Sequence, residues 1–252
     1  MKQIKSLGQV FLKDKNYLRK IANNLIVNNE MVCEIGPGQG ALTDYLIETA
    51  RSICCVEVDG RFADLLRKKY ADRDNVKIVT CDIRRFPLAN YSERVTVVGN
   101  IPYYLSSDII QYLIKHRDVV SYAYLTVQKE FANKLIGKIG TKEYGFLTCF
   151  LQYYAKTKKV FDIPARAFSP KPKVDSSFVS IEFLKEPSVA VMSDKKLFSV
   201  MKTAFSQRRK KIVNSLPSLK TNPNVLLSFG INPDARPENL SLKEFSILAN
   251  IL

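Results

Sequence analysis

The sequence has a single histidine, His116, and five cysteines, and no two of the cysteines form a C-x-x-C pair. Zinc sites are built mainly from histidine and closely spaced cysteine, so we expect no metal centre. A Ser-His-Asp triad is equally unsupported, because His116 lies between Lys115 and Arg117 in a charged stretch typical of a protein surface. Most of the cysteines fall in or beside apolar runs, where a free thiol behaves as a small hydrophobic side chain.

Long hydrophobic runs are also lacking. No window approaches the roughly 18 apolar residues that a membrane-spanning helix needs. The first fifteen residues, "MKQIKSLGQVFLKDK", contain no apolar stretch of the length found in signal peptides. We find no internal repeat and no low-complexity tract. These features predict a reduced, cytoplasmic protein without a membrane partner, and a monomer is the default state.

Charge of one sign dominates the 252 residues. Lys and Arg number 39 against 24 Asp and Glu, a formal net charge of +15. Such an excess indicates a polyanionic partner, and nucleic acid is favoured over a membrane surface because no strongly amphipathic, Lys-rich helix is evident. Residues 129–173 alone carry about half of the net charge. That concentration predicts a basic patch rather than a uniform coat.

Short apolar runs alternate with helix-like segments along most of the chain, which predicts an α/β fold with a doubly wound, mostly parallel sheet. We expect a first domain over residues 1–184, a linker over 185–193 and a small helical domain over 194–252. A closing antiparallel strand is expected over 174–184, and Ser241 and Glu244 have capping-box spacing at the last helix. The predicted parallel strands are 31–36, 52–59, 76–82, 94–100 and 121–128.

A glycine-rich turn, "EIGPGQGAL" (34–42), connects the first of these strands to a helix. Such a turn lets a ligand approach the backbone and the helix N-terminus. Gly36, Gly38 and Ala41 fit the dinucleotide pattern G-x-G-x-x-A, whereas Gly36, Gly38 and Gly40 fit the turn of S-adenosylmethionine (SAM) methyltransferases. This motif alone does not distinguish a dinucleotide from SAM.

Two carboxylates end the next strands. Glu57 stands where an acidic residue binds ribose hydroxyls in either cofactor family. Asp82 stands at the end of the third strand, where a SAM site uses an acid to accept a hydrogen bond from the adenine amino group. A dehydrogenase has no fixed need for that second acid, so Asp82 favours SAM.

The fourth strand ends in the turn Asn100-Ile101-Pro102-Tyr103. The exocyclic nitrogen of adenine is a poor nucleophile because its lone pair is delocalised into the ring. An Asn100 side-chain oxygen and an Ile101 carbonyl that accept its N–H groups would localise that lone pair, while Tyr103 offers a flat face for stacking. Orientation and electrostatics would then carry the rate without a strong base. The turn therefore predicts methyl transfer to an adenine amino group.

Together these stretches resemble the KsgA/Erm-type ribosomal RNA adenine N6-dimethyltransferases. "NIPYYLSS" is similar to their N-[LI]-P-Y-x-[IL]-[ST] motif and unlike the D-P-P-Y or N-P-P-Y of most amino-methylating DNA enzymes. The helical tail resembles KsgA more closely than Erm. The other matching stretches, in register along nearly the whole chain, are "SLGQVFLKD", "EIGPGQGALT", "VEVD", "VQKEFANKL", "PARAFSPKPKVDSSFVSI", "AFSQRRKKIVNSL" and "GINPDARPENLSLKEFSILAN".

The resemblance implies a Rossmann-like SAM-dependent methyltransferase fold with a mostly parallel seven-stranded sheet. It also assigns roles to individual residues: Asn100 and Tyr103 in catalysis, with Phe168 as the second face of an aromatic sandwich around a flipped adenine. Val10 and Tyr104 depart from the family pattern, which often has Asn or His at the first position and Asn at the second. The implied cofactor contacts are Val10 (by its backbone), Leu12, Gly36, Gly38, Glu57, Asp82 and Asn100.

The implied partner is small-subunit ribosomal RNA in a partly assembled 30S particle, with two adjacent adenosines near the 3′ end of the 16S-type RNA as targets. Basic residues are expected to bind phosphates around the flipped base. The alternative for the "QRRKK" run is a solvated helix face. The candidates for RNA binding are Lys171, Lys173, Arg208, Arg209, Lys210 and Lys211.

Three other functions are each compatible with part of the sequence. An Erm-type enzyme would methylate 23S RNA of the large subunit, and the KsgA-like tail argues against it. A non-catalytic RNA-binding assembly factor would keep the fold, but the intact Gly turn, Glu57, Asp82 and Asn100 argue against lost chemistry. A NAD-dependent dehydrogenase would leave both the Asn-Ile-Pro-Tyr turn and the basic excess unexplained.

Overall fold

The computed structural model describes residues 9–27, 30–91, 93–219 and 225–252. The first three residues of the N-terminal motif "SLGQVFLKD", 6–8, lie outside them. The chain forms two compact units, one of Met1–Ala132 with Lys158–Lys185 and one of Asn133–Thr157 with Glu186–Leu252.

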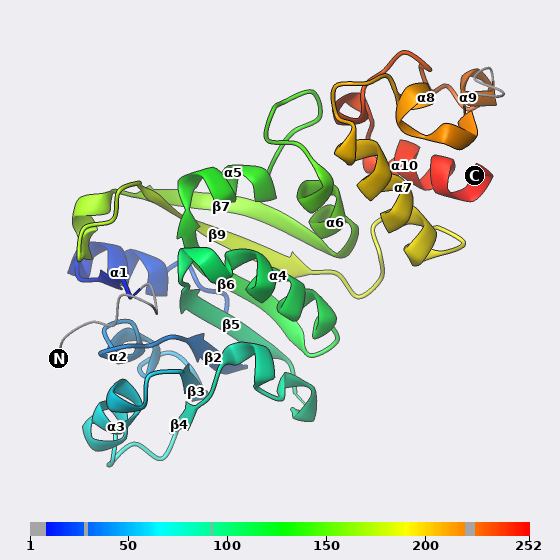
Figure 1. Ribbon diagram of the computed structural model, residues 1–252. Coiled ribbons are helices and arrows are strands. Elements are labelled where there is room, and N and C mark those ends of the chain that lie inside the picture. Colours follow the sequence, from blue (N-terminus) through cyan, green and yellow to red (C-terminus); the bar gives the residue numbers. More distant parts are fainter. Residues whose placement is uncertain (1–8, 28–29, 92, 220–224) are drawn as a thin grey trace. The chain divides into compact units, whose positions relative to one another are not determined.

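A seven-stranded sheet with the order β4-β3-β2-β5-β6-β9-β7 organises the first unit (Figure 1). The pairs β2–β3, β3–β4, β2–β5 and β5–β6 are parallel, and β9 pairs antiparallel with β6. The predicted parallel strands and the closing antiparallel strand are therefore confirmed. The strands are β2 (Met31–Ile35), β3 (Ser52–Glu57), β4 (Val76–Thr80), β5 (Val95–Asn100), β6 (Val120–Gln128), β7 (Ala155–Ile163) and β9 (Ser176–Phe183).

The register of the central strands brings their carboxyl ends to one edge. Ile35 of β2 lies opposite Val56 of β3 and Gly99 of β5. These strands are apolar on both faces because helices cover both faces of a parallel sheet. Every residue of β2 is buried, including Glu34, which is the one charged residue of that strand.

Helices flank the sheet, and two of them begin at capping aspartates. The side chain of Asp14 accepts a hydrogen bond at the start of α1, and that of Asp59 does so at the start of α3. A short antiparallel pair joins β1 (Phe11–Leu12) to β8 (Phe168–Ser169). The helices are α1 (Lys15–Ala22), α2 (Thr43–Leu46), α3 (Gly60–Lys69), α4 (Ser106–Lys115) and α5 (Lys129–Leu135), with 3₁₀ turns at 83–85, 88–90, 103–105 and 165–167.

The second unit is helical and is held by aromatic side chains. Phe198 of α7 makes edge contacts with Phe150 and Tyr153 of α6, and the Tyr153 hydroxyl donates to Asp194 at 2.7 Å. The predicted capping box of the last helix, Ser241 with Glu244, is confirmed. The helices are α6 (Phe146–Tyr154), α7 (Asp194–Ser206), α8 (Ile212–Ser215), α9 (Val225–Ser228) and α10 (Leu242–Ile251), with 3₁₀ turns at 217–219 and 237–239.

Two details differ from the sequence prediction. Residues 133–157, which include the end of α5 and the start of β7, fall in the helical unit and not in the first domain, because the aromatic face of α6 packs on α7. The basic stretch 129–173 is consequently divided between the two units. The "QRRKK" run lies in the turn between α7 and α8, since α7 ends at Ser206.

Phe178 of β9 tests how strongly the closing strand supports the sheet. Its side chain is 1% exposed, and its ring contacts Tyr124 and Phe161. We expect Phe178→Ala to lower the free energy of unfolding by about 3–5 kcal/mol, as is typical for a large buried ring. The control Phe178→Leu, which keeps most of the volume, should cost less than about 1.5 kcal/mol in urea denaturation. Equal losses for both variants would contradict this packing role.

Candidate cofactor and active site

Four predicted site residues meet at the carboxyl edge of the sheet. Gly36 follows β2, Glu57 ends β3, Asp82 follows β4 and Asn100 ends β5. All four line a pocket of about 230 Å³. A second pocket, of about 580 Å³, adjoins it and shares Gly36, Asn100 and Phe11. This is the edge of a doubly wound sheet where ligands bind.

The glycine turn exposes backbone to the pockets at one position and packs tightly at another. Gly36 has a φ of +64°, and a Cβ there would meet no atom within 4 Å. A ligand can therefore approach its main chain. Gly38 has a φ of +57°, and a Cβ would lie 2.5 Å from the Phe11 ring. Gly38 lines neither pocket, but its N–H donates to Glu57 at 2.9 Å, so its contribution is to hold that carboxylate.

The Glu57 side chain is only 4% exposed, and both of its carboxylate oxygens accept hydrogen bonds from the main chain. Oε2 accepts from Gly38 and Oε1 accepts from the Asp59 N–H, each at 2.9 Å. Burial raises the pKa of Glu57, and the two N–H donors oppose that rise. Each carboxylate oxygen has a further lone pair, so the fixed group can accept the two hydroxyls of a ribose.

Asp82 is held by its neighbour Arg84. The guanidinium donates to the Asp82 carboxylate at 2.6 Å, and its other arm reaches Asp108 of α4 at 3.1 Å. These bonds hold the pKa of Asp82 below its usual value, so the carboxylate stays an acceptor. Its carboxylate oxygens can therefore accept hydrogen bonds from a ligand in the pocket that Asp82 lines. Apolar residues that line the same pocket include Val58, Ile83, Leu105 and Ile109.

The Asn100 side chain is oriented by the main chain of the N-terminal segment. Its Nδ2 donates to the Val10 carbonyl oxygen at 2.7 Å. A carbonyl can only accept, so the nitrogen must face Val10 and Oδ1 must face away. Asn100 and Val10 line a hollow of about 20 Å³ together with Ile101, Pro102 and Tyr103. The Val10 backbone thus orients Asn100, and its predicted contact with SAM stays a prediction.

The three aromatic candidates have different surroundings. The Tyr103 hydroxyl is hydrogen-bonded to Ser176 at 2.8 Å, which fixes the ring beside the hollow. Phe168 is 4% exposed in the core cluster, its backbone pairs with Leu12, and it does not line the hollow. Its stacking role stays a prediction. Tyr104 is 60% exposed and lines the 230 Å³ pocket.

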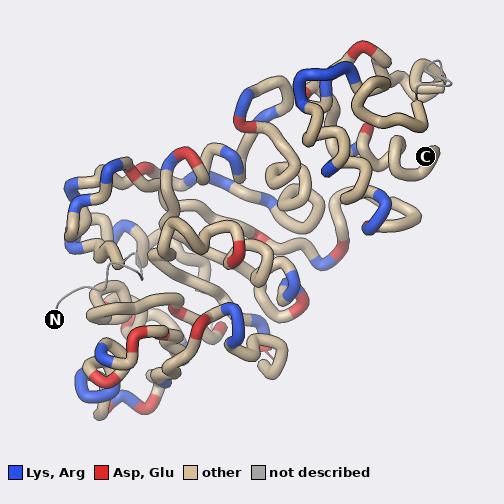
Figure 2. Tube along the Cα trace, in the orientation of Figure 1, with Lys and Arg blue, Asp and Glu red and all other residues tan. Residues whose placement is uncertain are grey.

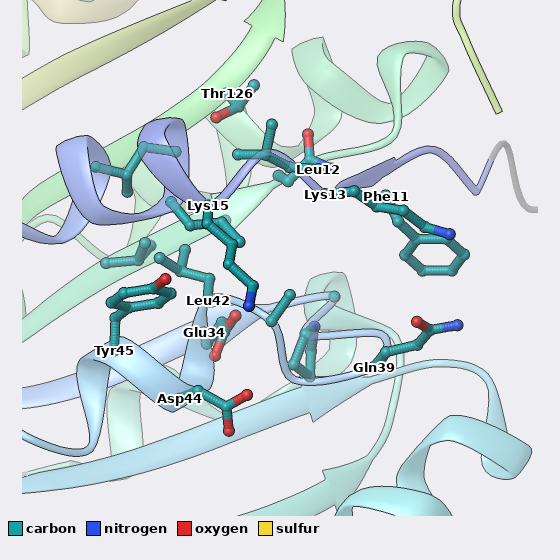
Figure 3. Close-up of a pocket in the computed structure, with 18 of the residues that line it drawn as sticks. Phe11, Leu12, Lys13, Lys15, Glu34, Gln39, Leu42, Asp44, Tyr45 and Thr126 are labelled. Atoms are coloured by element: carbon teal, nitrogen blue, oxygen red, sulfur yellow. The ribbon is translucent and has the colours of Figure 1, made fainter. Parts of the chain in front are cut away.

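Glu34 is a candidate site residue that the sequence did not single out. It lines the 580 Å³ pocket, where Figure 3 shows it near Asp44 with Lys15 extending from α1. The Thr43 hydroxyl donates to it at 2.7 Å. Burial raises its pKa to about 7. The signal was available, because Glu34 is the one charge inside the apolar strand "MVCEI". Leu12 lines this pocket as well.

The predicted RNA-binding residues lie on separate segments, which Figure 2 colours by charge. Lys171 and Lys173 are exposed on the proline-rich loop of the first unit. In the second unit Arg209 and Lys210 are exposed, Lys211 pairs with Asp234 at 2.9 Å, and Arg208 is only half-exposed. Among the described residues, no group of His, Cys, Asp and Glu could hold a metal ion, and no helix is long and apolar enough to cross a membrane.

Glu34 makes stability depend on pH. Its folded pKa of about 7 exceeds the ordinary value of 4.5, so the folded state holds a proton that the unfolded chain releases. Stability from this group is therefore full at low pH and is lost as pH rises through 7, by roughly 3 kcal/mol. We expect Glu34→Gln to remove this loss when urea unfolding is compared at about pH 5 and about pH 8. The exposed control Glu48→Gln should keep the wild-type pH profile, and parallel profiles for wild type and Glu34→Gln would contradict the assignment.

Comparison with known proteins identifies close relatives in sequence. A ribosomal RNA small subunit methyltransferase A from Fusobacterium nucleatum is 39% identical, covering 99% of this chain and 97% of the relative. A protein of the same name from Geobacillus kaustophilus is 37% identical, covering 98% of this chain and 90% of the relative.

Solved structures share the fold. The 23S rRNA methyltransferase ErmE superposes with a TM-score of 0.79 at 27% identity, covering 95% of this chain and 98% of that one. A dimethyladenosine transferase from Plasmodium falciparum also gives 0.79, at 25% identity and 95% of each chain. The predicted methyltransferase fold is thereby confirmed. The model of the family described as ribosomal RNA adenine dimethylase matches residues 1–252, and the chain belongs to this family.

Proposed function

We propose that the protein transfers methyl groups from SAM to adenine N6 in small-subunit ribosomal RNA, dimethylating two adjacent adenosines near the 3′ end of 16S-type RNA. Its partner would be a pre-30S particle in the cytoplasm, bound by a monomer. The observation that carries the proposal is the Asn100 amide, whose oxygen is turned away from Val10 at the edge of the cofactor pockets. The names of the relatives support the choice of the small subunit.

The residues at the strand ends fit SAM. The adenine amino group would donate to Asp82 in the apolar part of the 230 Å³ pocket, and the ribose hydroxyls would donate to Glu57. The open main chain at Gly36 leaves room for the remainder of the molecule toward Glu34, whose carboxylate suits an ammonium group. SAM supplies a methyl group activated by a positive sulfonium.

The chain's own task is to prepare the target nitrogen. Oδ1 of Asn100 and the carbonyl of Ile101 accept the two N–H groups of the adenine, so its lone pair is drawn out of the ring toward the methyl group. No strong base is required, because the nitrogen loses its proton after the methyl group has been transferred. The fixed amide therefore acts by orientation and by preorganised electrostatics.

Tyr103 would stack on the flipped base, since its hydroxyl anchors the ring to Ser176. For Phe168 to form the opposite face of a sandwich, its ring must leave the core position next to the β1–β8 pair. Tyr104 stands where relatives often have Asn, and its exposed ring beside the cofactor pocket bears on how a second methyl group is admitted.

An Erm-type activity on 23S RNA is the second candidate, favoured by the superposition on ErmE. The two substrates can be compared directly with undermethylated 30S subunits and protein-free 23S RNA, each with labelled SAM. We expect label in the adenosines of 30S only. Asn100→Ala should lower transfer by about a hundredfold or more while RNA binding persists. Label confined to 23S RNA, or full activity of Asn100→Ala, would overturn the proposal.

Glu57 offers a test of the cofactor site alone. In Glu57→Gln the side-chain NH₂ group must face one of the two backbone N–H donors, so one hydrogen bond becomes a repulsive contact. We expect the dissociation constant for SAM to rise about tenfold or more in calorimetric titration. The exposed control Glu48→Gln makes the same chemical change and should bind as wild type. Unchanged SAM binding by Glu57→Gln would remove Glu57 from the site.

A further inference from the structure

Arg208 is the first basic residue of the "QRRKK" run, and its guanidinium is engaged within the helical unit. Nε donates to the Glu238 carboxylate at 2.5 Å. Nη1 donates to the Lys142 carbonyl oxygen at 2.6 Å, and Nη2 donates to that of Thr141 at 2.8 Å. Three of its five N–H groups, one on each nitrogen, are thus engaged within the helical unit and fix the orientation of the guanidinium.

The carbonyls that Arg208 binds belong to an exposed loop, residues 138–142, which we name the basic loop. The Gly140 N–H donates to the Glu238 carbonyl oxygen at 2.8 Å. Within the loop, the Thr141 hydroxyl donates to the Lys138 carbonyl oxygen at 2.7 Å. Glu238 therefore holds the loop directly through its main chain and indirectly through Arg208. These bonds close a network between three segments distant in sequence.

The outer side of the basic loop carries side chains suited to an anionic partner. Lys138 is exposed, and the Lys142 side chain is 91% exposed, with only a loose 3.7 Å contact to Glu143. The exposed residues Arg209 and Lys210 directly follow the side chain that holds the loop. In Figure 2 the blue positions of the basic loop lie near those of the segment between α7 and α8, as the bonds from Arg208 to the loop require.

We propose that the basic loop, Arg209 and Lys210 form one phosphate-binding surface for ribosomal RNA, and that Arg208 is its positioning residue. The inference rests on the proposed RNA substrate. Arg208 itself does not contact RNA. Its planar fork spans two carbonyl oxygens and a carboxylate at once, which the single ammonium of a lysine cannot reproduce. Each lysine of the loop would neutralise a phosphate and release counterions.

The loop lysines are tested through the salt dependence of binding to undermethylated 30S subunits. Lys138→Gln and Lys142→Gln should each reduce the slope of log K against log salt by about 0.7–0.9, the contribution of one phosphate contact. The matched control Lys243→Gln removes an exposed charge from α10 of the same unit and should leave the slope unchanged. Wild-type slopes for both loop variants would overturn the inference.

The role of Arg208 is tested by Arg208→Lys, which keeps the charge and loses the fork. We expect the KM for 30S subunits to rise about tenfold at unchanged kcat, and the Gly140 amide to exchange at least tenfold faster with solvent. If Arg208 bound phosphate directly, the lysine variant would bind nearly as wild type and only Arg208→Gln would be weak; that result would overturn the assignment.

Glu238→Ala provides a second variant, which frees Arg208 without changing any basic side chain and should also raise KM and speed exchange at Gly140. Wild-type KM and exchange in this variant would equally contradict the network. The two proposals fail separately. Failure of the wild-type protein to methylate 30S subunits would reject the proposed function. If the wild-type protein methylates 30S subunits and the variants show its salt slope, KM and Gly140 exchange, only the basic loop surface would be rejected.

Discussion

The position of β2 between β3 and β5 is the constraint on which the whole candidate cofactor site depends. The parallel register sets Ile35 opposite both Val56 and Gly99. The residues that follow these three, Gly36, Glu57 and Asn100, therefore lie at the same level along the sheet. Gly36 is further tied to β3 by its N–H, which donates to the Val56 carbonyl oxygen at 2.9 Å. A slip of one residue would turn Glu34 to the other face of the sheet. The strand register therefore determines which side chains can meet at this edge of the sheet.

The site and the exterior have opposite electrostatic character. The protein carries a formal charge of +15, yet three carboxylates, those of Glu34, Glu57 and Asp82, line the two pockets and are held in place by hydrogen bonds. Burying such groups costs stability unless donors compensate, and each has its donors: a threonine, two backbone N–H groups and an arginine. Carboxylates inside a basic protein suit the proposed pair of ligands, because SAM carries a positive sulfonium and ribosomal RNA is a polyanion.

The sequence allowed the sheet and most of its edge to be predicted, because the alternation of apolar runs and the motifs at strand ends are local signals. Other features depended on contacts that are distant in sequence. Phe168 lies in a motif, but its burial follows from the pairing of β8 with β1. Arg208 looked like part of a charge run, and only the folded chain brings Glu238 to it. Residues 133–157 belong to the helical unit because of ring contacts such as Phe150 with Phe198, and no change of amino-acid composition along the sequence marks this boundary.

The contact between Asn100 and Val10 is made by a main-chain oxygen, and this has an evolutionary consequence. Any side chain at position 10 presents the same carbonyl, so the residue identity there can drift, as valine in place of the family's frequent Asn or His illustrates. The spacing of the segment has no such freedom, because inserting or deleting one residue before Phe11 would bring a different carbonyl, or none, to the amide. This stretch should thus accept substitution readily and reject changes of length.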